Sequence, residues 1–139
     1  MKRLPDWRQR LEAAIDDIRR TPFAWGTHDC GPALAGRVVL AITGEDVAAP
    51  YRGKYRTASE AVRLIRECGF SDLADLAASI APEVHPSRAR IGDIAAFRID
   101  SSALGSALGV VNGERVLVIR PEGIGTMSLL QAHRAFKVG

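Results

Sequence analysis

The sequence of 139 residues is poor in cysteine and in aromatic side chains, and it contains no long apolar run. It has two cysteines, Cys30 and Cys68, which excludes a disulfide scaffold and a four-thiolate zinc site. No apolar run approaches the roughly 20 residues of a membrane-spanning helix, so we expect no membrane insertion. The N-terminal segment MKRLPDWRQR lacks the apolar region of a secretory signal peptide, so we expect none.

A strong excess of charge of one sign is also absent. The 19 basic and 16 acidic residues give a net charge of +3, and aromatic residues make up only 6% of the chain. Nucleic-acid-binding domains typically carry a dense basic stripe interleaved with aromatic side chains. The basic residues here are dispersed, so we expect a solvated basic face and no nucleic-acid partner, with contact to an anionic polymer such as cell wall as the alternative.

Histidine is scarce as well, and the three histidines are scattered along the chain. A protein metal site needs three or four converging ligands, so we expect no metal ion and no cofactor. The rest of the composition, 47% apolar and 25% charged, is typical of a globular protein and excludes disorder. The length suits one domain with its own core, and we predict a single domain over residues 1–139.

The first half of the sequence predicts helices. Apolar residues recur at three- and four-residue steps over residues 5–20, as in an amphipathic helix. Residues 33–42 are nearly all apolar, which predicts a buried central helix that ends at Gly44. Thr57 and Glu60 have the spacing of a capping box and open a third helix, and a weaker helix follows over residues 71–80. The inner face of the third helix is predicted to consist of Ala61, Leu64, Ile65 and Cys68.

The second half predicts strands. Residues 93–99 form one, and residues 107–111 and 115–119 flank Asn112-Gly113, a pair typical of type I′ hairpin turns. Pro121 and the glycines after it predict turns, and residues 135–138 predict a last strand. Helices followed by antiparallel strands indicate an α+β domain, in which N-terminal helices pack on a C-terminal antiparallel sheet.

Cys30 lies at the expected N-terminus of the buried helix. There, unpaired backbone N–H groups and the positive end of the helix dipole would lower the thiol pKa, and the same amides could hold an oxyanion. These are the requirements of a cysteine hydrolase. The alternative is that Cys30 is a small apolar residue that fills space beneath the loop, and we expect that packing role for Cys68.

Three blocks of the sequence resemble one known family. Trp25-Gly26 followed by Asp29-Cys30, and then the strand that begins Gly92-Asp93, are similar to the NlpC-like cell-wall peptidases of the papain-like superfamily. The resemblance implies a papain-like NlpC-type fold with Cys30 as the nucleophile. Its third block is a strand whose histidine is the general base. The matching residues are Ala107-Leu108-Gly109-Val110, so Ala107 stands at the histidine position and the Cys-His dyad is incomplete.

The chain also resembles a group of small NlpC-related proteins of phage and prophage tail modules. The similarity lies in residues 23–30, in Thr43-Gly44 and in residues 52–57. It implies a structural protein of the tail tip, made in the bacterial host cytoplasm and located in the virion tail, with hub or baseplate proteins as partners. The alternative is an active cysteine peptidase or amidase that cleaves the peptide cross-bridges of peptidoglycan during cell entry.

An active enzyme would need another general base. His28 lies two residues before Cys30, and side chains two apart in an extended loop point the same way, so Cys30 and His28 form the candidate catalytic pair. The alternative is a loop histidine that hydrogen-bonds to the backbone or to water. His133 is a second candidate base, whereas His85 is expected at the surface.

Overall fold

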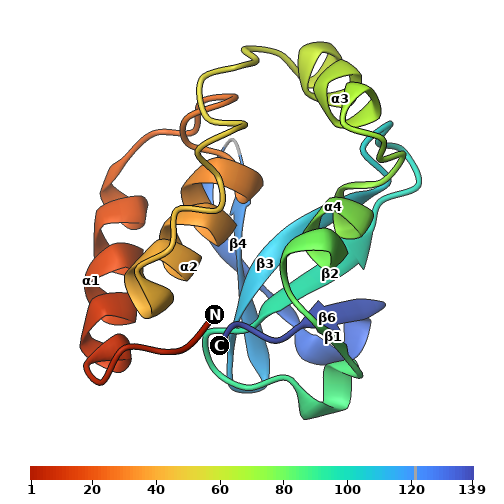
Figure 1. Ribbon diagram of the computed structural model, residues 1–139. Coiled ribbons are helices and arrows are strands. Elements are labelled where there is room, and N and C mark those ends of the chain that lie inside the picture. Colours follow the sequence, from red (N-terminus) through yellow and green to blue (C-terminus); the bar gives the residue numbers. More distant parts are fainter. Residues whose placement is uncertain (121) are drawn as a thin grey trace.

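The computed structural model describes residues 1–120 and 122–139, and it confirms the α+β class. Four α-helices and a six-stranded antiparallel sheet make up the described fold (Figure 1). The helices are α1 (Trp7–Arg20), η1 (Cys30–Ala35), α2 (Gly36–Thr43), α3 (Ala58–Glu67), α4 (Leu73–Ile80) and the short η2 (Pro86–Arg88) and η3 (Leu129–Gln131). The strands are β1 (Glu83–Val84), β2 (Ile94–Arg98), β3 (Ser106–Asn112), β4 (Arg115–Arg120), β5 (Gly123–Ser128) and β6 (Arg134–Phe136).

The sheet separates two apolar layers. Its strand order is β1-β6-β2-β3-β4-β5. Successive side chains of a strand point to opposite faces. Accordingly, Ile94, Leu108 and Val110 pack with residues of α1, α2 and α4, whereas Phe97 and Val111 belong to a separate cluster on the other face. The helices therefore cover one face, as expected.

The buried central helix begins at Cys30, as predicted. Its first segment, η1, is a π-helix that passes directly into α2. The helix ends at Gly44, which has φ +82° and caps it in the left-handed conformation. Val38 and Ile42 are fully buried between α1 and the sheet. The first residue of this helix, Cys30, is half-buried, and η1 lies next to β3.

The two ends of the chain lie together (Figure 1). The guanidinium of Arg3 donates hydrogen bonds to the carbonyl oxygen of Val138 at 2.8 Å and to Oδ1 of Asp93 at 3.0 Å. Asp93 also accepts from the backbone N–H groups of Arg90 and Val138, so the buried carboxylate is fully partnered. Asp93, which lies just before β2, thus links the N-terminal segment to the C-terminal segment.

Two local predictions are wrong. The hairpin turn consists of Gly113 and Glu114, because Asn112 pairs with Arg115, and only Gly113 has a positive φ. A glycine at the first central position is typical of a type II′ turn rather than type I′. Cys68 is exposed rather than on the inner face of α3, because the helix ends at Glu67 and the chain turns away at Gly69, with φ +91°.

Two strands were not predicted. β1 has only two residues, too few for an alternating pattern, and it pairs with β6. β5 contains two glycines, which are depleted in strands, yet it pairs with β4 along its whole length. Pro121, expected in a turn, lies outside the described residues. No helix in the described part of the chain is long and apolar enough to cross a membrane.

Candidate functional site

Asp29 is the centre of the candidate site. It is buried and precedes η1 as its N-cap residue. Its Oδ1 accepts from the N–H of Gly31 at 3.0 Å, and its Oδ2 accepts from the N–H of Gly26 at 2.9 Å and from the hydroxyl of Tyr55 at 2.6 Å. One carboxylate therefore joins the loop before the helix, the helix terminus and the segment that leads to α3.

The Trp25-Gly26 pair has a packing role. Gly26 has φ +85°, and a Cβ built on it would lie 2.0 Å from the carbonyl oxygen of Tyr55. Its own carbonyl oxygen accepts from the N–H of Gly53 at 2.9 Å. Two loops therefore cross in contact at this position, and only glycine leaves room for them.

The thiol of Cys30 is not activated. Cys30 is half-buried, and desolvation raises its pKa from 9.0 to about 11, with the negative charge of Asp29 acting in the same direction. Backbone hydrogen bonding at Leu108 and at Cys30 itself lowers the pKa but does not outweigh burial. The direction is opposite to the one expected at a helix N-terminus. The main reason is desolvation, and the carboxylate of Asp29, which already accepts the N–H of Gly31, adds to it because its charge offsets the helix dipole.

The ring of His28 contacts α1, and no hydrogen bond joins it to Cys30 among the described residues. It is buried, and its Nε2 lies 3.0 Å from the carbonyl oxygen of Ile18, near the end of α1. Its backbone N–H donates to the carbonyl oxygen of Ala24 in a tight loop. The ring thus ties this loop to α1. The structure therefore supports the alternative of a structural loop histidine over that of a base for Cys30.

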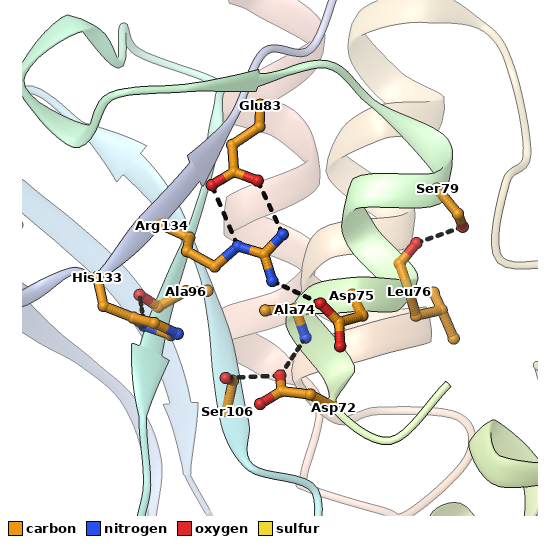
Figure 2. A network of polar contacts seen from close by, with 10 residues as sticks. All are labelled: Asp72, Ala74, Asp75, Leu76, Ser79, Glu83, Ala96, Ser106, His133 and Arg134. Carbon is orange, nitrogen blue, oxygen red and sulfur yellow. Dashed lines mark hydrogen bonds and ion pairs between the residues drawn. The ribbon is translucent and has the colours of Figure 1, made fainter. Parts of the chain in front are cut away.

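The other two histidines are also engaged elsewhere. His133 places Nδ1 2.9 Å from the carbonyl oxygen of Ala96, beside the ion pairs of Arg134 (Figure 2). His85 is on a loop, where its Nδ1 contacts Ser87. The described residues that act on the pKa of the Cys30 thiol include no histidine. The structure brings Cys30 together with Asp29 and Tyr55, and not with a base.

Ala107 lies on the sheet face that the helices do not cover. It pairs with Phe97 across β2 and β3, and directly opposed residues share a face. Phe97 belongs to the cluster on the far side of the sheet, whereas the next residue, Leu108, packs with the helices near Cys30. In this register, position 107 does not face the thiol.

A second polar group, which the sequence did not predict, joins α4 to the sheet (Figure 2). Arg134 pairs with Asp75 of α4 at 2.7 Å and with Glu83 of β1 at 2.8 Å. Asp72 caps α4 by accepting from the N–H of Ala74, and it also accepts from the hydroxyl of Ser106. The contacts Ser106–Asp72, Arg134–Glu83 and Arg134–Asp75 join residues 34 to 59 positions apart, so local spacing held no signal for them. Their contacts are those of a structural clamp.

The described residues include no group of three or more histidine, cysteine and acidic side chains arranged to hold a metal ion. A comparison with curated proteins found no significant match. A family model described as "Domain of unknown function (DUF6950)" matches residues 2–138, nearly the whole chain. The chain therefore belongs to the DUF6950 family.

Proposed function

We propose that this chain is a non-catalytic domain of the NlpC-like, papain-like type, and that it is a structural protein of a phage or prophage tail tip. One observation carries the loss of catalysis: the thiol of Cys30 lies beside a buried carboxylate and has no histidine partner among the described residues. A cysteine nucleophile needs a lowered pKa or an adjacent base, and this site supplies neither.

The arrangement around Cys30 supports the fold part of the proposal. A cysteine begins the most buried helix, and that helix packs on an antiparallel sheet through β3. Three of the residues that carry the resemblance have structural roles here. Gly26 permits the loop crossing, Asp29 caps the helix and Asp93 fixes the termini. These three residues thus stabilise the fold, whereas no histidine is placed to act as a base for Cys30 among the described residues.

The partners and the location follow from the resemblance to tail-module proteins. The expected partners are hub or baseplate proteins, and the expected location is the virion tail. This part is tested by mass spectrometry of tails purified from phage particles that encode the chain. Stoichiometric presence of the chain in washed tails is expected, and its absence from intact tails would contradict the proposal.

The alternative is an active cysteine peptidase or amidase that acts on peptidoglycan. It is favoured by the partial exposure of Cys30 and by the backbone N–H groups at Leu108 and Cys30, which are donors of the kind that hold an oxyanion. This alternative requires a base that moves to the thiol from elsewhere in the chain or from a partner.

A Cys30→Ala variant separates the two functions. The structural proposal predicts normal virion assembly and normal infectivity, with Cys68→Ala as the matched control at an exposed thiol. Particles that assemble normally but lose infectivity only in Cys30→Ala would favour the enzyme. The purified wild-type protein, under reducing conditions, is expected to release no muropeptides from cell wall. Release that disappears in Cys30→Ala would contradict the proposal.

A further inference from the structure

An apolar cavity of about 90 Å³ lies inside the fold, between the central helix, α3, α4 and the sheet. Its walls come from two separate core clusters. One contributes Leu73, Ala77 and Leu108, and the other contributes Ala61 and Ile65. The cavity therefore lies between the two core clusters, where they do not pack fully against each other.

The size of the cavity is unusual for a packing defect. Protein interiors contain few voids larger than a water molecule, and one water occupies roughly 10–15 Å³ on the same measure. Small residues from four different segments line the space, namely Ala35, Ala48, Ala61, Ala77 and Ala81. A larger side chain at any of several of these positions would fill it.

The walls are unsuited to water. The two buried polar side chains that line the cavity, Asp29 and Tyr55, hydrogen-bond to each other, and Asp29 has two further backbone donors. A buried water needs two to four polar partners, and an apolar cavity without them stays dry or takes an apolar guest. The chemistry of the wall therefore selects an uncharged, hydrocarbon-like ligand.

The cavity also has an entry side. Several of its lining residues, among them Trp25, Cys30 and Tyr51, are only half-buried, so the cavity reaches toward solvent on their side. The segment of residues 44–57, drawn in yellow in Figure 1, rises beside α2 and leads to α3, whose Ala61 and Ile65 are buried in one core cluster with Leu76 of α4.

We propose that this cavity is a binding site for a small uncharged apolar molecule, or for the apolar end of a larger one, of about the size of one aromatic ring. The site lies beside Cys30 and is independent of any catalytic role. It extends the proposed function, because a structural protein without activity can still bind a ligand in its core.

Benzene is the probe, and benzoate, the same ring with a negative charge, is its control. Amide resonances of the wild-type chain near the cavity are expected to shift saturably with benzene and not with benzoate, and benzene should raise Tm by about 3 °C near saturation. Ala77→Leu fills the cavity and should abolish both effects while the protein stays folded. The matched control is Ala13→Leu, the same change at an exposed position of α1.

The outcomes decide the proposal in either direction. No saturable response up to the solubility limit of benzene overturns it, and so does a response that persists in Ala77→Leu. If Ala77→Leu does not fold, Ala61→Leu, on the opposite wall, takes its place. Failure of both variants to fold, with Ala13→Leu folded, means that the space is absent and also overturns the proposal.

Discussion

The hydroxyl of Tyr55 donates a hydrogen bond of 2.6 Å to Oδ2 of Asp29, across 26 residues of sequence. Both side chains are buried, and burial, together with the charge of Asp29, raises the pKa of Tyr55 well above its ordinary value. The contact places the segment before α3 against the terminus of the central helix. It thereby defines one wall of the apolar cavity and the environment of the Cys30 thiol.

Tyr55→Phe is expected to lower the free energy of unfolding by about 1.5–3 kcal/mol, the usual value of a hydrogen bond to a charged group. The buried carboxylate of Asp29 would keep only its two backbone donors. Urea denaturation measures the change. Tyr51→Phe, which removes the same hydroxyl from a half-buried position on the cavity, is the control. Equal effects of the two substitutions would show that the Tyr55–Asp29 hydrogen bond does not contribute specifically to the free energy of unfolding.

Gly26→Ala is expected to destabilise the fold more than Gly113→Ala. Both glycines have a positive φ, at +85° and +82°, so both substitutions carry backbone strain of about 1–2 kcal/mol. Only at Gly26 would the added methyl group meet backbone, the carbonyl oxygen of Tyr55, whereas Gly113 has open space around it. Thermal denaturation of both variants isolates the contribution of the close approach. A Tm as high in Gly26→Ala as in Gly113→Ala would contradict it.

Stability is expected to fall as the pH rises from 9 toward 11. The folded-state pKa of Cys30, about 11, lies above the ordinary value of 9.0, so its contribution is complete below pH 9 and is lost as the pH approaches and passes 11. The loss is about 2 kcal/mol or less, since Cys30 is partly exposed. Tyr55 adds to the same decline, because its pKa is also raised.

Denaturation curves for Cys30→Ala and Cys68→Ala at several pH values show whether Cys30 causes the loss of stability at high pH. The first variant should show a shallower fall with pH than the wild type, and the second should match the wild type. Identical pH dependence in all three proteins would mean that Cys30 is not buried in its neutral form.

Charge-selective labelling is expected to distinguish the two cysteines. Uncharged methyl methanethiosulfonate and its anionic and cationic derivatives all react with the same thiolate, so the ratio of their rates at one site is independent of the thiol pKa. Cys68 is exposed and should react with all three reagents, whereas Cys30, on an apolar cavity, should react mainly with the uncharged one. Mass spectrometry gives the rates site by site. Equal ratios at Cys30 and Cys68 would contradict the apolar environment.

The fold could be predicted where local patterns determine structure. The apolar periodicity of α1, the glycine that ends α2 and the Thr57 cap of α3 are all confirmed. Each depends on residues within one or two turns of the chain. The strands β2, β3 and β4 were also located within one or two residues by their alternation and by the hairpin between the last two.

The site could be predicted only in part. The position of Cys30 at a helix terminus followed from sequence, but its raised pKa depends on burial and on the nearby carboxylate of Asp29. The side chain of His28 could not be oriented, because its partner, the carbonyl oxygen of Ile18, lies on another element. The contact of Tyr55 with Asp29 and the ion pairs of Arg134 join distant segments and left no local signal.

Cys30 is a half-buried neutral thiol with a raised pKa, and this property separates it from an activated nucleophile. The most direct test of this property is the rate of iodoacetamide alkylation against pH, measured separately at Cys30 and Cys68 on folded protein, with folding monitored by circular dichroism. The rate at Cys30 is expected to keep rising with pH, with an apparent pKa near 11. A plateau at Cys30 with an apparent pKa below the ordinary value of 9.0 would show instead that the thiol is activated.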